Sequence, residues 1–404
     1  MIIGIIGGGA SGMAAAISAS GMSGVQVILF ERQARVGRKL LATGNGRCNL
    51  TNMKATGDVY HGQQPDFARY ALSEMDPETT LQWFRSLGLY TVAEPSGRVY
   101  PYSDQANSVV DVLRLQLEKP NVELRTGFEV QKIKKTETGF QVSSSEETVA
   151  VDKLIIACGG LAGSKLGGTM SGYKLLGKLG HRSTKLRPAL VQLKSSWGSL
   201  TALKGIRTNC QVQILCDGVL FAESRGELQF TEYGLSGPVI FEISRDVCAK
   251  TGTWTACLDF LPELSLEDIK KELQRRQNTT LPIQELLTGI LHNRLGRVLT
   301  QAAGVGINGL CKDLKQGDLQ AVCEACKGFE VVLTEPMGMD HAQVTAGGVL
   351  TEQFDPETME SLLVPGLYAC GEVLDIDGDC GGYNLQWAWS SGYLAGLCAG
   401  KDSK

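Results

Sequence analysis

The N-terminal stretch constrains this chain more than any other feature. An apolar run at 1–6 leads directly into a glycine-rich segment with the spacing G-x-G-x-x-G, formed by Gly7, Gly9 and Gly12. Small, helix-forming residues follow, and a second apolar run then ends in Glu31, 19 residues after Gly12. Strand, glycine turn, helix, strand and acid in this order predict a βαβ unit that binds a dinucleotide.

Each part of this motif has a physical reason. Gly7 permits the tight turn from strand to helix, Gly9 lets a pyrophosphate approach bare backbone, and Gly12 lets the helix pack closely on the strand. The helix N-terminus offers unpaired N–H groups and a partial positive charge to the phosphates. Glu31 can accept hydrogen bonds from the diol of a ribose.

Composition narrows the functional class. The chain has 404 residues, of which 43% are hydrophobic and 20% charged, with a net charge of −4. No segment concentrates Lys or Arg, so no nucleic-acid partner is expected. No apolar run reaches the length of about 18 residues that a membrane span needs. The apolar N-terminus lacks the basic lead of a signal peptide, and a cytoplasmic enzyme is therefore expected.

The 12 cysteines are scattered and come without a secretion signal, which indicates reduced thiols. Cys323 and Cys326 form a C-x-x-C on a segment with helical character. Two ordinary helical thiols are favoured, and a redox pair or half of a metal site stays the alternative. No second pair completes a metal site, so no metal is predicted.

The segment after Glu31 does not continue as a helix. Residues 33–52 form a polar loop rich in Gly, Arg and Asn. Such a loop can place cations and backbone amides along an extended anionic cofactor. Further along, the apolar run 154–158 ends in Gly159, which predicts another buried strand that meets a glycine turn beside the cofactor.

The middle of the chain changes character near residue 187. Short strand-like pieces separated by turns predict a small β-barrel or sandwich, at 191–193, 211–216, 219–223, 226–230 and 254–259. Residues 262–328 are largely helical in pattern, with Ser265 as a helix N-cap. The last 70 residues return to a strand at 366–372, a glycine-rich acidic turn and a helix at 384–396, which completes a two-nucleotide site.

These motifs together resemble the BaiN/YhiN-type flavoproteins, also described as aminoacetone-oxidase-family FAD-binding enzymes. The resemblance covers nearly the whole chain. Its most specific parts are the loop at 43–52 and the tail at 371–389; the others are 7–12, 37–39, 97–101, 234–238 and 344–349.

The resemblance implies an α/β protein with an FAD-binding, Rossmann-like domain of the two-dinucleotide-binding type. An inserted β-barrel and a helical domain would complete it. The implied boundaries are 1–187 and 334–404 for the FAD domain, 188–260 and 328–333 for the barrel, and 261–327 for the helical domain.

Family roles carried onto this chain give a set of cofactor residues. Glu31 would bind the adenosine ribose, Val130 would offer backbone to the adenine, and Lys39 would line the channel between pyrophosphate and flavin. The whole expected set is Gly7, Gly9, Ala10, Ser11, Gly12, Glu31, Arg32, Arg38, Lys39, Gly46, Arg47, Cys48, Asn49, Val130, Cys158, Gly159, Gly371, Glu372, Gly382, Tyr383, Asn384 and Leu385. Two departures affect the lining: Cys158 stands where the family often has Thr, and the run 166–172 differs from the usual one.

The resemblance also implies a reaction: reduction of a carbon–carbon double bond conjugated to a ketone, as in oxidised bile-acid intermediates. Reduced flavin would give hydride to the β-carbon and an acid would protonate the α-carbon. Tyr100 and Tyr383 are the candidate acids, and Arg98 could bind a carboxylate or polarise a carbonyl. No second G-x-G-x-x-G is present, so no separate NAD(P)H domain is expected. NAD(P)H is expected to dock transiently at the flavin face as electron donor, with another source of electrons as the alternative. A flavin-dependent amine or aminoketone oxidase and a non-catalytic FAD sensor remain the alternatives.

Overall fold

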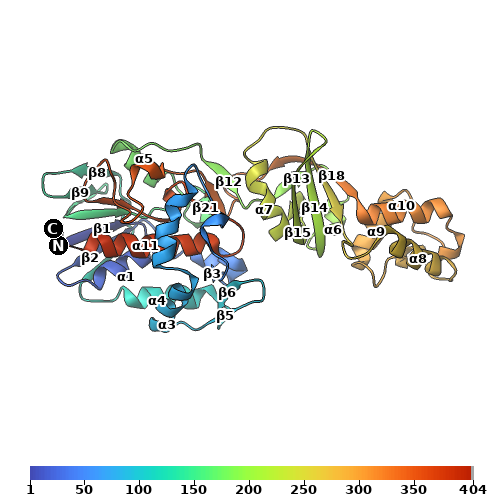
Figure 1. Ribbon diagram of the computed structural model, residues 1–404, viewed down its shortest axis with the longest axis horizontal. Helices are drawn as coiled ribbons and strands as arrows, with labels where there is room; N and C mark the ends of the chain where they lie inside the picture. The colour runs from blue at the N-terminus through green and yellow to red at the C-terminus, as the bar shows by residue number, and fades with distance from the viewer. Residues whose placement is uncertain (402–404) are drawn as a thin grey trace. The chain divides into compact units, whose positions relative to one another are not determined.

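The computed structural model describes residues 1–401 (Figure 1). Contacts between Cα atoms divide the chain into two compact units. Unit 1 contains Met1–Pro188 together with the chain from Ala342 onward, and unit 2 contains Ala189–His341. Unit 1 is therefore built from both ends of the chain, and unit 2 is inserted between them.

Unit 1 is organised around a five-stranded parallel sheet. Its strand order is β20-β11-β1-β2-β7, so β1 lies in the centre, opposite both β2 and β11. The apolar runs form strands because both faces of a parallel sheet are buried: Ile5 pairs with Leu29 on one side and Ile155 on the other. The strands are β1 (Ile2–Ile6), β2 (Gln26–Glu31), β7 (Val122–Thr126), β11 (Lys153–Ile156) and β20 (Leu367–Ala369).

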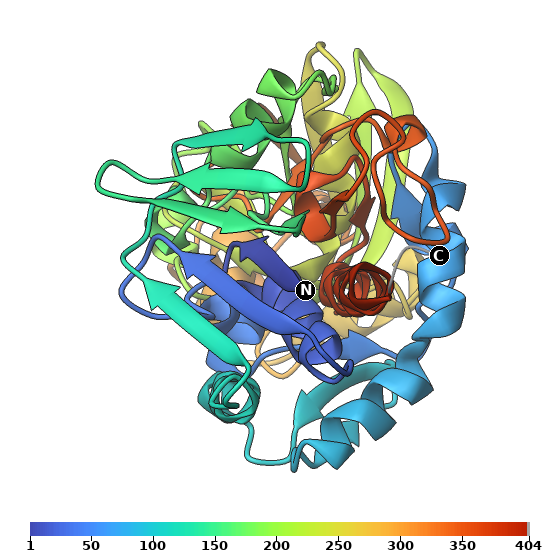
Figure 2. The same cartoon turned by 90° about the vertical axis from the view of Figure 1, so that its left-hand side faces the viewer.

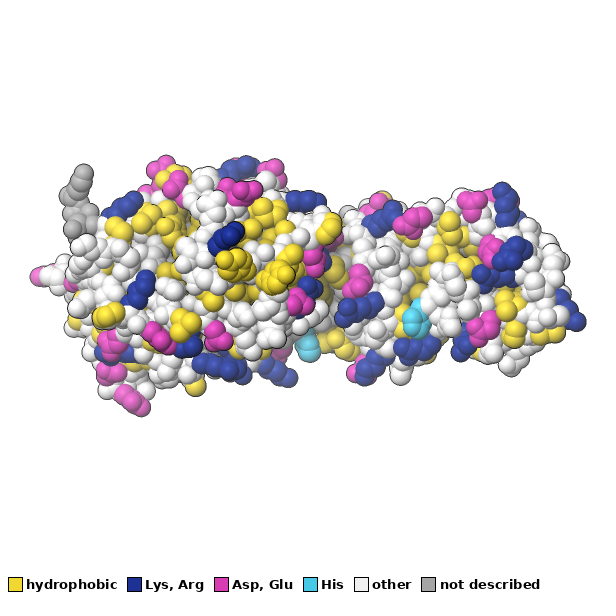
Figure 3. All heavy atoms as spheres, turned by 90° about the horizontal axis from the view of Figure 1, so that it is seen from below, with side chains coloured by type: hydrophobic (Ala, Val, Ile, Leu, Met, Phe, Trp, Pro, Cys, Tyr) yellow, Lys and Arg dark blue, Asp and Glu magenta, His cyan; other side chains and the backbone are white. Residues whose placement is uncertain are grey.

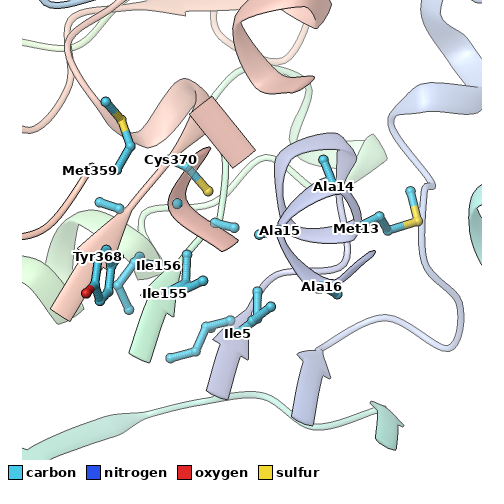
Figure 4. Close-up of a cluster of buried hydrophobic side chains, with 14 of the residues drawn as sticks. Ile5, Met13, Ala14, Ala15, Ala16, Ile155, Ile156, Met359, Tyr368 and Cys370 are labelled. Carbon is cyan, nitrogen blue, oxygen red and sulfur yellow. The ribbon is translucent and has the colours of Figure 1, made fainter. Parts of the chain in front are cut away.

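Two helices from opposite ends of the chain pack together beside this sheet. They are α1 (Ala10–Ser20) and α11 (Tyr383–Gly400). Small residues allow the close approach: a Cβ placed on Gly392 would overlap the backbone of Ser11, and one on Gly396 would overlap Ala15. Figure 4 shows part of this buried core: Ile5 of β1 and Ile155 of β11 lie beside α1, and Met13 projects from the side of α1 away from β11 and Cys370.

Smaller elements complete unit 1. The antiparallel strands β8 (Lys132–Lys135), β9 (Phe140–Ser143) and β10 (Thr148–Val151) lie on the other side of the parallel sheet from α1 in Figure 2. A second small sheet has the order β3-β6-β5, and a pair joins β4 to β21. The strands of these two sheets are β3 (Thr51–Asn52), β4 (Tyr60–His61), β5 (Thr91–Ala93), β6 (Arg98–Pro101) and β21 (Asp377–Gly378). Two further short strands are β12 (Arg187–Ala189) and β19 (Val344–Ala346). The remaining helices are α2 (Ala68–Glu74), α3 (Pro77–Ser86), α4 (Ala106–Gln116) and α5 (Ser171–Lys178).

Unit 2 contains a closed barrel with the strand order β13-β16-β15-β14-β17-β18. Its strands are β13 (Leu193–Ser195), β14 (Arg207–Cys216), β15 (Val219–Phe230), β16 (Gly234–Ser236), β17 (Trp254–Asp259) and β18 (Phe329–Pro336). Its helices are α6 (Leu200–Leu203), α7 (Pro238–Val247), α8 (Leu266–Gln277), α9 (Asn293–Ala302) and α10 (Gln316–Lys327). One hydrophobic core joins barrel residues such as Leu258 to helical residues such as Leu273.

The sequence pattern predicts most of these elements, and the differences have local causes. The apolar residues between 66 and 90 recur at helical spacing, but the structure has two helices there, α2 and α3. The break arises because Asp76 caps α3 by accepting a hydrogen bond from the Thr79 N–H (2.7 Å) and Pro77 occupies its first turn. Ser265 is the expected N-cap and forms a capping box with Asp268. The structure adds α7, which the pattern did not predict. The finer separation of barrel and helical domains stays a prediction.

Candidate cofactor and active site

The glycine turn has the form that the motif predicts. Gly7 has φ of 110°, and its N–H donates to the Phe30 carbonyl (2.8 Å). A Cβ on Gly7 would overlap the Ala157 carbonyl, and a Cβ on Gly12 would overlap the Gly7 carbonyl. A Cβ on Gly9 would meet nothing within 4 Å. Gly7 and Gly12 thus serve backbone packing, and Gly9 leaves open space at the start of α1, where Ala10 and Ser11 lie.

Glu31 is buried at the end of β2, and both carboxylate oxygens accept hydrogen bonds from backbone. The Gly8 N–H donates to Oε2 and the Gln33 N–H donates to Oε1, each at 2.7 Å. The acid therefore fixes the glycine turn to the end of β2. A carboxylate oxygen has more than one lone pair, so these bonds leave Glu31 able to accept from a ribose hydroxyl as well.

Two long helices begin without a side-chain cap. α1 begins after Gly9 and α11 after Gly382, and neither has a capping side chain or an acid in its first turn. The first N–H groups of a helix need acceptors and carry partial positive charge. A pyrophosphate and the pyrimidine edge of a reduced flavin are both suitable acceptors, so these residues fit FAD.

Several residues of the loop after β2 have the positive φ angles of the left-handed region. Its 3₁₀ segment, Leu40–Gly46, is interrupted by Gly44 and Asn45 with φ of 56° and 57°, and Gly46 and Cys48 also have positive φ. Burial raises the pKa of the Cys48 thiol to about 12, so Cys48 packs as an apolar group. Asn49 places its Oδ1 in a buried position against Gly382, without a hydrogen-bond partner among residues 1–401. The loop and the start of α11 are therefore in direct contact.

Lys39 is the cation of this loop that reaches the C-terminal half of the site. Its Nζ lies 2.9 Å from Oε2 of Glu372, and the other Glu372 oxygen accepts from the Thr345 N–H (2.8 Å). Gly371 precedes Glu372 with φ of 74°, and its N–H donates to the Ser391 hydroxyl of α11 (3.0 Å). Residues more than 330 positions apart in the sequence are thus joined in one site.

The turn before α11 is fixed by amide and phenol side chains. Asn384 accepts from the Gly378 N–H (2.8 Å) and donates to its carbonyl (2.7 Å). Tyr60 donates its hydroxyl proton to the Tyr383 carbonyl (2.9 Å), and Asn52 donates to the Gly381 carbonyl (2.9 Å). Leu385 follows in the first turn of α11. This network determines where the N-terminus of α11 points.

The other predicted cofactor residues lie around the same sheet edge, with their side chains in protein contacts. Arg32 donates to the Gly167 carbonyl (2.9 Å) and Arg38 to Oε1 of Gln33 (2.7 Å). Val130 is buried in the segment after β7, and Gly159 has φ of 67° after β11. The Cys158 thiol contacts the Ile6 carbonyl (3.6 Å), and burial raises its pKa to about 12.

Of the three candidate catalytic residues, Arg98 and Tyr383 lie close to Gly381, just before α11. Arg98 places Nε 3.2 Å from the position of a Cβ on Gly381, and the Tyr383 ring lies 3.6 Å from the same point. Tyr100 lies two residues along β6, buried beneath Arg47, whose guanidinium carbon is 3.9 Å from the ring centroid. Burial, with Glu94 adding to it, raises the pKa of Tyr100.

The two arginines differ in their partners. Arg47 forms ion pairs with Asp104 and with Glu94 (3.4 Å) in addition to its contact with Tyr100. Arg98 has no carboxylate partner within residues 1–401. Arg47 is therefore committed to holding the loop on β6, and Arg98 is the cation that remains available to a ligand.

The C-x-x-C pair lies in unit 2 and has no reactive character. Cys323 and Cys326 are both buried on α10, and burial raises their pKa values to about 11 and about 12. Within residues 1–401 no group of three or more His, Cys, Asp or Glu side chains could hold a metal ion. In the same part of the chain, no helix has the length and apolar character to cross a membrane.

Several residues of the site were not anticipated from the sequence. Asn52, Tyr60 and Thr345 hold the turn before α11 and Glu372, and His61 contacts Asp379 (2.7 Å). Asn52 lay in the polar loop 33–52, and Thr345 lay in the segment 344–349 that carries part of the resemblance. Tyr60 and His61 come from the two-residue strand β4, which carries too little periodicity to be recognised.

Comparison with known proteins gives the same fold. The family model described as "HI0933-like protein Rossmann domain" matches residues 1–398. The chain is 41% identical to a 3-dehydro-bile acid delta(4,6)-reductase of Clostridium scindens, over 98% of both chains. It is 34% identical to a ribosomal RNA dihydrouridine synthase of Escherichia coli K12, over 99% of this chain and 98% of the relative. A solved 3-ketosteroid delta1-dehydrogenase from Sterolibacterium denitrificans matches with a TM-score of 0.50, at 14% identity, over 98% of this chain and 99% of that one.

These findings confirm the expected family and the Rossmann-type FAD-binding fold with its closed barrel. They leave the predicted absence of a nucleic-acid partner without support, since one relative is named for a reaction on ribosomal RNA. Net charge was a weak guide here because it says nothing about the local surface that faces a ligand. The chain belongs to the HI0933-like family of FAD-dependent oxidoreductases.

Proposed function

We propose that this protein reduces a carbon–carbon double bond conjugated to a ketone in a small, largely apolar molecule of the bile-acid or steroid type. The observation that carries the proposal is the 41% identity to the bile acid reductase over 98% of both chains. The chemistry of the site agrees with it, because Arg98 and the phenol ring of Tyr383 lie beside Gly381, just before α11, and Tyr100 lies two residues from Arg98 on β6.

The roles of these residues follow from their chemistry. FAD, when bound, would supply the hydride chemistry of the reduction, with NAD(P)H as the proposed electron donor. Arg98 donates hydrogen bonds to the carbonyl oxygen, where negative charge develops. Tyr100 or Tyr383 then delivers a proton to the α-carbon, and solvent reprotonates the phenol. The raised pKa of Tyr100 keeps its proton in place at neutral pH.

The test is an anaerobic titration of the holoenzyme. NADH or NADPH should bleach the flavin absorbance, and a bile-acid enone should restore it with formation of the saturated ketone. Recolouring by oxygen alone after bleaching by an amine would overturn the proposal in favour of an amine oxidase. Slow bleaching by every donor would favour a sensor without turnover. We also propose NAD(P)H as the electron donor and a cytoplasmic location.

One observation favours a second candidate. The E. coli relative, at 34% identity over nearly the full chain, is named a ribosomal RNA dihydrouridine synthase. The C5–C6 double bond of uracil is itself conjugated to the C4 carbonyl, so the same hydride and proton transfers would reduce it. Recolouring of the bleached flavin by a uridine-containing ribosomal RNA fragment, with no response to bile-acid enones, would establish this candidate instead.

A further inference from the structure

The β5–β6 hairpin in unit 1 presents one face that the site described so far does not explain. Val92 pairs with Tyr100 directly across the two strands. Backbone hydrogen bonds extend this register in both directions, from the Tyr102 N–H to Tyr90 O and from the Glu94 N–H to Arg98 O, each 2.8 Å. Directly paired residues, and residues two apart, share a face of an antiparallel ladder. Three pairs therefore lie in a row on this face: Glu94–Arg98, Val92–Tyr100 and Tyr90–Tyr102.

This row leads from the candidate active site to the surface. Arg98 at its inner end contacts Gly381 just before α11. Tyr102, at its outer end just after β6, lies four residues further along the chain, about 14 Å away at 3.4 Å per residue. The outer residues are open to solvent, with exposed fractions of 63% for Tyr90, 47% for Val92 and 77% for Tyr102. Figure 3, which views unit 1 from the side of β5 and β6 in Figure 1, shows hydrophobic side chains gathered there.

The charges beside the row indicate what kind of molecule it suits. Two carboxylates lie in or beside the row. Glu94 belongs to its inner pair, and Asp104 follows Tyr102 by two residues in the sequence. Arg47, the cation between them, is neutralised by both. Binding of RNA draws on several cations that neutralise phosphates, and carboxylates beside the path oppose it. Aromatic and apolar side chains, with Arg98 at the inner end and Arg85 over the Tyr90 ring at the outer end (5.2 Å), suit a rigid, apolar body that carries a carbonyl at its inner end.

We propose that this face, named here the Tyr90–Tyr102 face and formed by Tyr90, Val92 and Tyr102, is the surface along which the substrate's ring system lies; Tyr100 is buried beneath Arg47 in the same row. It selects rigid apolar polycyclic ketones over RNA, with the carbonyl end toward Arg98. The proposal rests on the proposed function, and it adds the residues that discriminate between the two substrate classes.

The experiment measures binding, separately from turnover. Dehydrolithocholic acid, a saturated 3-keto bile acid with no double bond to reduce, is titrated into oxidised holoenzyme while the flavin spectrum is followed. The variants are Tyr90→Ser with Tyr102→Ser, and Val92→Ser alone. Leu115→Ser on α4 is the matched control, because Leu115 is an exposed apolar residue (53%) outside the hairpin. FAD content and the bleaching rate with NAD(P)H confirm that each variant keeps its cofactor site.

The double serine variant should raise the Kd of the ketone at least about 10-fold, through lost aromatic surface. Leu115→Ser should leave it unchanged, and a uridine-containing RNA hairpin should bind all forms equally weakly. Unchanged ketone affinity in the double variant would overturn the proposal, and so would tight RNA binding that the tyrosine substitutions abolish. If the ketone binds in a tyrosine-dependent way but no enone is reduced, the proposed function fails while this surface stands. If enones are reduced but their KM is unchanged in the variants, the proposed function stands and the Tyr90–Tyr102 face is not the substrate surface.

Discussion

Gly392→Ala is the substitution that most directly tests how the two ends of the chain form the site. A Cβ at this position would lie 2.9 Å from both Cα and the carbonyl carbon of Ser11, and closer still to its oxygen. These are backbone atoms within α1, so no flexible side chain can move aside. The two helices would have to separate by roughly 1 Å to reach ordinary contact, and overpacking of this kind costs about 1–3 kcal/mol.

Two effects oppose each other in this substitution. Removing a glycine from a helix interior favours folding by about 1 kcal/mol. The clash is with rigid backbone, so we take the upper end of the overpacking cost and expect a net loss of about 2 kcal/mol in the free energy of unfolding. Because Ser11 lies in the first turn of α1, the shift should also displace the N–H groups that face the pyrophosphate and weaken FAD binding about 10-fold.

The assay is denaturant unfolding of the apoprotein together with FAD binding followed by flavin fluorescence. Gly177→Ala is the control, since Gly177 lies in α5, is exposed, and a Cβ there would meet nothing within 4 Å. That control should be stabilised by about 0.5–1 kcal/mol with unchanged FAD affinity. If Gly392→Ala behaves like Gly177→Ala, the close contact between α1 and α11 is not what positions the phosphate-binding turn.

Three further predictions concern single side chains. Lys39→Met and Glu372→Gln should each weaken FAD binding about 10-fold, and the double variant should lose less than the two effects combined, because each residue holds the other at 2.9 Å; additive losses would contradict a coupled pair. Cys323 and Cys326 should resist iodoacetamide at pH 8, measured by mass spectrometry, because burial raises both thiol pKa values to about 11 and about 12; rapid labelling or a disulfide between them would refute this. Burial lowers the pKa of His181, whose Nε2 contacts the Ser361 hydroxyl (2.8 Å), so the folded state binds its proton less readily than the unfolded chain does. Stability should therefore fall as pH drops below about 6.5, by at most about 1.4 kcal/mol per pH unit, and His181→Gln should remove that part of the slope in pH-dependent unfolding.

The cofactor half of the protein was predictable because its signals are local. The turn from β1 to α1 requires glycines at fixed spacing, and Gly7 and Gly12 are required by backbone contacts within a few residues or by the neighbouring strand. The buried parallel strands appear as continuous apolar runs. Ser265 caps α8 by a bond to a residue three positions away, so its signature is contained in the sequence itself.

The surroundings of the candidate catalytic residues could not be predicted in the same way, because they depend on pairings across long intervals. Asn52 reaches Gly381 only because β3 pairs with β6 and the C-terminal turn returns beside them. No periodicity marks a strand of two residues, and Arg98 looks the same in the sequence whether its partner is a carboxylate or a ligand. The contrast between Arg98 and Arg47 exists only in three dimensions.

The contact between α1 and α11 is buried and the Tyr90–Tyr102 face is exposed. This difference bears on how one fold can serve more than one substrate. Reduction of a bile-acid enone and of uracil needs the same hydride and proton transfers, so the residues that hold the cofactor need not differ between relatives. Gly392 cannot be changed without moving α1, and its replacement affects folding and cofactor together. Tyr90 and Tyr102 are mostly exposed, and substitutions at exposed positions usually change stability by no more than about 0.5 kcal/mol. A change of substrate at the β5–β6 face would therefore leave the fold and the flavin site intact, which makes this hairpin the place where relatives with different substrates should differ in sequence.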